Sequence, residues 1–168
     1  SYDDMETIKL GCSVPVICDD LVIYGYQLLK AKSSGADAIK LHASILTTTE
    51  IEYNIKVAKA IGLTCIVVVA SVPQALAVLK EVPSLQALCI TGRNVRLWKL
   101  QPGKANKILT DTLVQEALIE FNNNLESSDL PPLVIFQDGF STPSELSEAA
   151  TNGVHAAILG EELVGTSL

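Results

Sequence analysis

Residues 65–70 are CIVVVA, the strongest strand signal in the chain. The run is continuous and β-branched, which is typical of a strand buried on both faces. Helix signals flank it. The triplet TTE at 48–50 predicts a capped helix start, Gly62 predicts the end of that helix, and a second helix is predicted from Pro73 to about Lys80. A buried strand between two helices favours a parallel sheet covered by helices.

The same alternation extends in both directions along the chain. Six strands separated by helices predict parallel pairing with right-handed crossovers, in a single α/β domain over residues 1–168. An open doubly wound sheet and a barrel both satisfy this pattern, but no glycine-rich nucleotide-binding motif follows the first strand. The other expected strands are 14–18, 36–44, 85–95 with its following loop, 133–136 and 156–159; the other expected helices are 25–32, 110–123 and 141–150; and 122–132 is an expected surface loop.

Composition narrows the class of protein further. Hydrophobic residues make up 48% of the chain and charged residues only 18%, so much of the backbone must lie between layers. The net charge of −7, with the basic residues scattered, argues against direct nucleic-acid binding. No apolar run is long enough to span a membrane. The four cysteines show no CxxC spacing, and Cys65 and Cys89 are expected to be small buried hydrophobes in a reducing compartment.

Five segments resemble the indole-3-glycerol-phosphate synthase family. Their order and spacing follow strands three to eight of that family's barrel over nearly the whole chain. The resemblance therefore implies a (β/α)₈ TIM barrel of which this chain covers about strands 3 to 8. The matching segments are VPVICDDL at 14–21 followed by YQ at 26–27, GADAI at 35–39, ITGRNV at 90–95, QDGFSTP at 137–143 and AILGEEL at 157–163.

Two consequences of this register concern what lies outside the chain. Six strands cannot close an eight-stranded barrel, so we expect a missing upstream segment, or a partner that supplies the open edge. The start at Ser1, with Met5 as the only methionine, favours a piece of something longer. Cys18 and the long loop at 122–132 are most similar to the plant form of the family, which implies a plastid protein of the chloroplast stroma.

The resemblance also places the family's catalytic positions. Its general-acid lysine falls on Asp19, and an ionised aspartate offers no proton to a substrate carbonyl. Its strand-five carboxylate falls on Val68, which cannot titrate, and its strand-seven glutamate falls on Gln137, which can only hydrogen-bond. An asparagine falls on Thr91, whereas Arg93 is retained. No catalytic set remains intact for the family's mechanism.

The resemblance preserves only part of the family's phosphate-binding site. Gly139 and Gly160 stand where backbone N–H groups would meet the phosphate of a small phosphorylated ligand. Asp138 replaces a serine beside that site, and Glu162 adds further negative charge. The resemblance therefore implies weakened phosphate binding. The sequence predicts no cofactor.

Lys40 and His42 occupy alternate positions of one predicted strand, so both point to the same face. One interpretation is a new site, in which Lys40 is a Schiff-base amine beside Asp19 and His42 is a base. We favour the alternative of a buried or half-buried ion pair and a hydrogen-bonded histidine. His155 is expected at the surface, and two histidines without a carboxylate cluster predict no metal site. Trp98 and Tyr53 are expected to be packing or partner-contact residues.

Three functions follow from these positions. The leading hypothesis is a catalytically inactive synthase-like barrel that serves as a structural or protein-interaction component, with protein partners in a plastid complex. The first alternative is an active indole-3-glycerol-phosphate synthase of tryptophan biosynthesis. The second alternative is a barrel enzyme with new chemistry at Asp19, Lys40 and His42. Fold alone does not choose among them, because function depends on the site.

Overall fold

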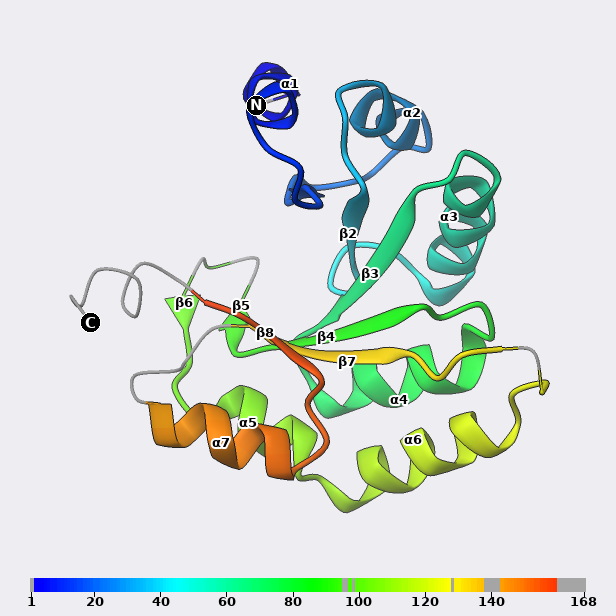
Figure 1. Ribbon diagram of the computed structural model, residues 1–168. Coiled ribbons are helices and arrows are strands. Elements are labelled where there is room, and N and C mark those ends of the chain that lie inside the picture. Colours follow the sequence, from blue (N-terminus) through cyan, green and yellow to red (C-terminus); the bar gives the residue numbers. More distant parts are fainter. Residues whose placement is uncertain (1, 95–96, 98, 128, 138–142, 160–168) are drawn as a thin grey trace.

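A curled sheet of six parallel strands forms the centre of the computed structural model, which describes residues 2–94, 97, 99–127, 129–137 and 143–159 (Figure 1). The order is β1-β2-β3-β4-β7-β8, and neighbouring strands are parallel. This confirms the prediction of a partial (β/α)₈ barrel: the sheet is a curled half-barrel. The strands are β1 (Ile17–Cys18), β2 (Ala38–His42), β3 (Thr64–Val69), β4 (Ala87–Thr91), β7 (Leu133–Gln137) and β8 (Ala156–Ile158).

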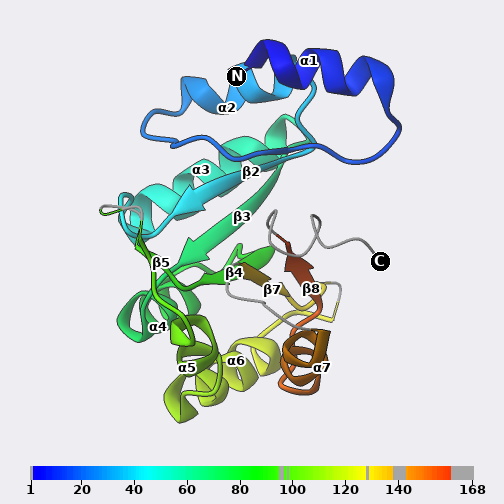
Figure 2. The ribbon, with the colours of Figure 1, turned by 90° about the vertical axis from the view of Figure 1, so that its left-hand side faces the viewer.

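Helices connect consecutive strands of the sheet, as the alternating pattern predicted. They are α2 (Tyr26–Ser33), α3 (Thr48–Ala60), α4 (Val72–Glu81), α5 (Lys104–Leu109), α6 (Thr112–Asn123) and α7 (Pro143–Thr151), and a further helix, α1 (Tyr2–Gly11), precedes β1. In both views α1 and α2 lie side by side at the β1 end of the sheet (Figures 1 and 2). A cation–π contact joins them, with Lys30 Nζ 4.4 Å from the ring centre of Tyr2.

Four elements were not predicted from the sequence: two helices and two short strands. Helix α1 has only one buried residue, Met5, so its apolar periodicity is weak. A short antiparallel ladder of β5 (Arg93–Asn94) and β6 (Lys99–Leu100) follows β4. Helix α5 begins after Gly103, whose φ of +72° lies in the left-handed region that glycine tolerates best.

Local capping explains where the central helices start and end. Thr47 caps α3: its hydroxyl accepts from the Glu50 N–H, and the Glu50 carboxylate accepts from the Thr47 N–H, which is a capping box. The cap therefore lies one residue before the predicted hydroxyl pair. After α3, Gly62 has a φ of +67°, as expected for a residue that ends a helix. Ser71 caps α4 through the Gln74 N–H.

The two faces of the sheet bury different sets of side chains. Outward residues of the central strands pack against the helices in the larger core, for example Val67 on β3 and Leu88 on β4. Inward residues form a smaller cluster of Ile66, Val68, Ala87, Cys89 and Ile135. Strand β3 is buried on both faces, as its β-branched run predicted. Alternation along each strand therefore separates an outer core from a barrel interior.

One large apolar residue of α6 faces away from the core. Leu113 is 58% exposed, whereas Val114, Leu118 and Phe121 are buried on α6. The helix starts with its cap at Asp111, and this register turns position 114 inward in place of 113. Ala117 is partly buried against the same core.

The half-barrel has two open edges among the described residues. Strand β1 pairs only with β2, and β8 pairs only with β7. Six strands leave the barrel unclosed, as predicted. An upstream segment and a partner both remain predicted suppliers of the further strands.

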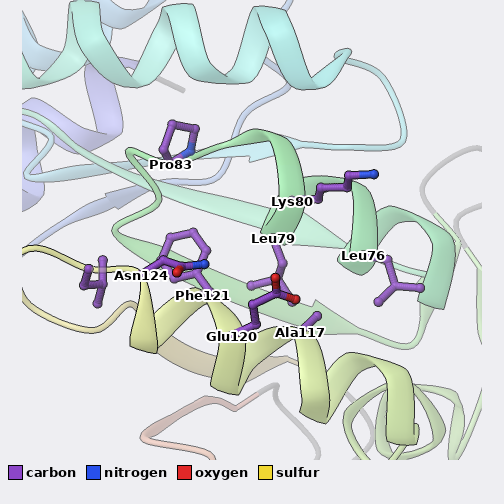
Figure 3. Close-up of a pocket in the computed structure, with 9 residues that line it drawn as sticks. Leu76, Leu79, Lys80, Pro83, Ala117, Glu120, Phe121 and Asn124 are labelled. Atoms are coloured by element: carbon purple, nitrogen blue, oxygen red, sulfur yellow. The ribbon is translucent and has the colours of Figure 1, made fainter.

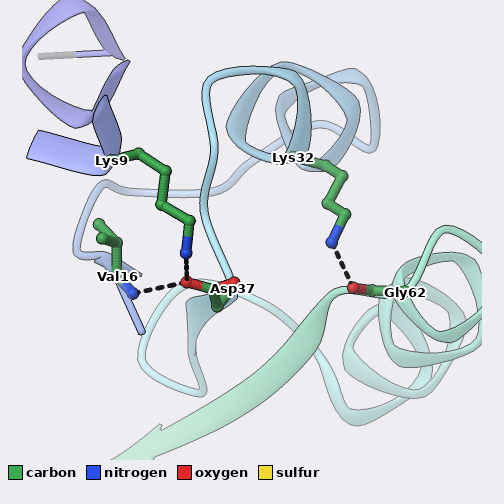
Figure 4. A network of polar contacts seen from close by, with 5 residues as sticks. All are labelled: Lys9, Val16, Lys32, Asp37 and Gly62. Atoms are coloured by element: carbon green, nitrogen blue, oxygen red, sulfur yellow. Dashed lines mark hydrogen bonds and ion pairs between the residues drawn. The ribbon is translucent and has the colours of Figure 1, made fainter. Parts of the chain in front are cut away.

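A carboxylate fixes the chain where β1 and β2 begin. Asp37 Oδ2 accepts from Lys9 Nζ at 2.7 Å and from the Val16 N–H at 2.8 Å, so it joins α1 to the entry of both strands (Figure 4). Nearby, Lys32 Nζ donates to the Gly62 carbonyl at 2.6 Å and links α2 to the start of β3. The Lys9 ammonium and the Val16 N–H hold the pKa of Asp37 below its ordinary value.

We expect Asp37 to make stability depend on acid pH. Its folded pKa is lowered, so its contribution is fully present above the unfolded pKa of about 4 and is lost as pH falls through the folded pKa. Thermal unfolding of the parent between about pH 6 and pH 2.5 is expected to show this loss. Asp37→Asn and Lys9→Met are both expected to reduce it. An identical pH slope in parent and variants would contradict the assignment.

Candidate functional site

The C-terminal ends of the strands gather the positions named from the sequence. Asp19 follows β1 directly, Val68 is the penultimate residue of β3, and Thr91 and Gln137 end β4 and β7. Because the strands are parallel, these ends form one rim of the half-barrel, which is where barrel enzymes carry their sites. The structure therefore brings together the four degenerate positions.

Lys40 is the centre of this site. Its side chain is only 2% exposed, and its ammonium donates to Asp19 Oδ2 at 2.7 Å and to Gln137 Oε1 at 2.9 Å. These bonds join β2 to the residue after β1 and to the end of β7, across the interior of the curled sheet. A buried ammonium requires such partners, because an unpaired charge in the interior is costly. The favoured prediction of a buried ion pair at Lys40 is confirmed.

The acceptors of Lys40 explain what the rim can do chemically. Asp19 is 56% exposed, but its carboxylate faces the Lys40 ammonium as an ion pair and offers no proton. Gln137 cannot titrate, and its Oε1 also lies 3.7 Å from Cys89 Sγ as an acceptor. Val68 is 2% exposed within the apolar interior cluster. The rim thus holds a polar network of Asp19, Lys40 and Gln137 beside the apolar interior cluster.

His42 stands beside this network on the inner face of β2. It pairs in register with Val68 of β3, which offers no side-chain hydrogen bond. The Nδ1 atom of His42 is buried, and it has no hydrogen-bond partner among the described residues. The prediction of a hydrogen-bonded histidine is therefore wrong for this atom. Burial lowers the pKa of His42; attraction by Asp19 partly opposes this, and the Lys40 charge adds to it.

We expect His42 to titrate below the ordinary histidine pKa of about 6.5 in the folded protein. Below about pH 6.5 the His42 imidazole is protonated more readily in the unfolded chain than in the folded chain. The free energy of unfolding therefore falls as pH falls from about 6.5 through the folded pKa. Titration of the imidazole by NMR measures this directly. Asp19→Asn is expected to lower the pKa further, since the attraction to Asp19 is removed. A folded pKa at or above 6.5 would contradict this account.

The remaining predicted site residues are only partly placed. Thr91 is buried, and its Oγ1 accepts from the Arg93 N–H at 3.0 Å. Arg93 lies half-buried on β5, next to the rim. Gly139 and Gly160, the proposed phosphate positions, lie outside the described residues, as do Asp138, Glu162 and Trp98.

The other reactive or titratable side chains named from the sequence differ in how deeply they are buried. Cys18, Cys65 and Cys89 are buried free thiols, as predicted for the last two, and burial raises the pKa of Cys65 to about 12. His155 is exposed, and its Nδ1 accepts from the Val134 N–H at 3.0 Å. Tyr53 is 64% exposed on α3. In the described part of the chain, no group of three His, Cys, Asp or Glu side chains is arranged to hold a metal ion.

Sequence reasoning missed the link between Lys40 and Gln137. The two residues are 97 positions apart and stand on strands separated by β3 and β4. The available signal was that both occupy inward positions near the strand ends.

No helix in the described residues is long and apolar enough to cross a membrane.

Comparison with known proteins was made by sequence and by structure. A family model described as indole-3-glycerol phosphate synthase matches residues 1–167. Indole-3-glycerol phosphate synthases from Acaryochloris marina and Crocosphaera subtropica are each 29% identical over 164 residues, and that from Microcystis aeruginosa is 27% identical. The match covers 98% of this chain and 50–52% of those relatives. The chain thus spans about half the length of the curated relatives it matches.

Solved structures resemble the half-barrel at low sequence identity. The tryptophan synthase α-subunit from Pyrococcus furiosus matches with a TM-score of 0.63 at 12% identity, over 98% of this chain and 63% of that one. An N-acetylmannosamine-6-phosphate 2-epimerase from Clostridium perfringens matches with a TM-score of 0.62 at 18% identity, over 96% of this chain and 70% of that one. At these identities the likeness concerns the fold alone.

Proposed function

The chain belongs to the indole-3-glycerol phosphate synthase family, and on that premise we propose that it is a member without synthase activity. Its role is that of a structural or protein-interaction component. The observation that carries the proposal is the polar network at the rim, where the Asp19 carboxylate and the Gln137 amide both bind the Lys40 ammonium. Two of the side chains at the positions that the resemblance assigns to acid–base catalysis, Asp19 and Gln137, are thus bound to Lys40.

The energetics of proton transfer support this proposal. A general acid or base contributes about 10²–10⁴-fold to a rate, and it must titrate near the working pH. Val68 and Gln137 do not titrate in this range. Lys40 supplies an ammonium, but its charge is neutralised by Asp19 at 2.7 Å. Among the described residues, the positions that the resemblance assigns to the family's catalysis therefore hold no free acid–base pair for ring closure, decarboxylation and loss of water.

Synthase activity of the full-length protein is the direct test. We expect no formation of the indole ring by fluorescence and no rescue of a tryptophan-requiring strain that lacks the enzyme. The matched positive control is the 29% identical synthase from Acaryochloris marina, expressed in the same strain. Circular dichroism must show that the tested protein is folded. Turnover by the folded protein would refute the proposal and favour an active synthase.

We further propose that the protein works in the plastid. The support is the similarity of Cys18 and of the long 122–132 loop to the plant form of the family. Immunodetection in fractionated organelles is expected to place the full-length protein in the stroma, in a fraction larger than its own mass. A protein recovered only from the cytosol would overturn this assignment.

One observation favours a second candidate function. Lys40 Nζ lies 2.7 Å from Asp19 Oδ2, and the unpartnered Nδ1 of His42 is on the same strand face. In a Schiff-base reaction Asp19 would take a proton from the Lys40 ammonium, and the amine would attack a carbonyl with loss of water. Borohydride trapping with a panel of aldehydes and ketones tests this, with Lys40→Met as control. Absence of trapping at Lys40 would remove this candidate.

A further inference from the structure

An apolar groove lies between α4 and α6, on the helical side of the half-barrel and away from the rim (Figure 3). Its volume is about 540 Å³. Leu79 and Phe121 are its most buried apolar members, with 6% and 8% exposed. Its apolar walls are completed by Leu76, Pro83, Ala117 and Leu125. A hollow of this size offers room for several large apolar side chains.

Two opposite charges line this groove. Lys80 comes from α4 and Glu120 from α6, and both are exposed (Figure 3). Neither side chain makes a hydrogen bond or ion pair with another residue in the described part of the chain. The groove therefore presents one unpaired cation and one unpaired anion beside apolar walls. An occupant with the complementary pair of charges would satisfy both.

The walls also indicate the conformation of the occupant. Both are helices, whose backbone groups are already hydrogen-bonded, so an extended peptide would find no main-chain partners there. A helix satisfies its own backbone and can pack its ridge of side chains between two others. Helices α4 and α6 have 10 and 12 residues, which corresponds to about three turns.

We propose that the α4/α6 groove binds an amphipathic helix of a protein partner. Its apolar residues at i, i+3 or i+4 and i+7 enter the groove, an acidic residue meets Lys80 and a basic residue meets Glu120. This inference rests on the proposed role as a protein-interaction component and names the kind of partner that the role requires. It is independent of whether the rim is catalytic.

Photo-crosslinking in native extract tests the groove. The full-length protein carries a benzophenone amino acid at Ala117, or at the exposed Tyr53 of α3 as a control outside the groove. We expect the position-117 probe to capture one segment, mapped by mass spectrometry, with an amphipathic helical pattern and both charges. Capture of a second copy of this chain, of a non-helical segment, or at position 53 alone would overturn the proposal.

A synthetic peptide of the captured segment then tests the charges. Fluorescence anisotropy is expected to show about fivefold weaker binding to Lys80→Glu and to Glu120→Lys, since such peripheral ion pairs contribute modestly. Reversing the matching charge of the peptide should restore the affinity. Lys59→Glu on α3 makes the same change in net charge as Lys80→Glu and should leave the affinity unaltered. Equal affinity for parent and groove variants would refute the proposal, whereas synthase turnover would refute only the inactive assignment.

Discussion

Replacing Asp19 by lysine is expected to destabilise the full-length protein by about 3 kcal/mol, the scale of breaking a buried ion pair. The Lys40 ammonium is 2% exposed and loses the only charged partner that it has among the described residues. It then faces a second ammonium at the same position, with the neutral Gln137 as its remaining acceptor. Urea unfolding, followed by circular dichroism, measures the change in free energy of unfolding. The resemblance places the family's general-acid lysine at this position, and we expect a lysine there to be incompatible with Lys40.

Removing the buried charge of Lys40 should destabilise the protein less than removing its partner. Lys40→Leu removes the buried charge and leaves Asp19, which is 56% exposed and can be hydrated, so its cost is expected to stay below about 1 kcal/mol. Asp19→Lys combined with Lys40→Leu should therefore recover most of the lost stability. Asp20→Lys, next to Asp19 but without contact to Lys40, is the charge control. Equal losses for Asp19→Lys in both backgrounds would contradict a coupled pair.

The strands could be predicted because their signal is local. A run such as 65–70 is buried on both faces, so nearly every position is apolar and the strand is evident without its neighbours. Helix α1 gave no such signal, because it buries little beyond Met5 and is tied down by the Lys9–Asp37 ion pair instead. Helix α5 depends on a left-handed Gly103, and its six residues are too few for a clear apolar period.

Only those features of the site that follow from the alternation of side chains along one strand could be predicted. Positions 40 and 42 share a face by the two-residue period, and this placed Lys40 and His42 together. The bond from Lys40 to Gln137 depends on the curl of the sheet, which no local pattern specifies. The missing partner of His42 Nδ1 likewise depends on Val68 standing opposite it in register.

Two neighbouring residues of β4 should differ sharply when truncated. Leu88 is fully buried in the outer core, so Leu88→Ala is expected to cost about 2–5 kcal/mol through lost burial and the cavity left behind. Cys89 is equally buried but faces the smaller interior cluster, and Cys89→Ala removes a single heavy atom, for an expected cost of about 1 kcal/mol. Urea unfolding of both variants of the full-length protein measures the two costs.

The comparison tests how the half-barrel is held together. Helices pack on the outer face, so a cavity at position 88 is surrounded by rigid elements that cannot collapse into it. The interior cluster includes few residues, and Gln137 at its rim accepts from Lys40 and Cys89, so loss of the thiol leaves the Lys40 bond in place. Cys89→Ser, which keeps a donor, should match Cys89→Ala within about 1 kcal/mol. If Cys89→Ala costs as much as Leu88→Ala, the interior is packed as tightly as the helical face, and the outer core is not the main source of stability.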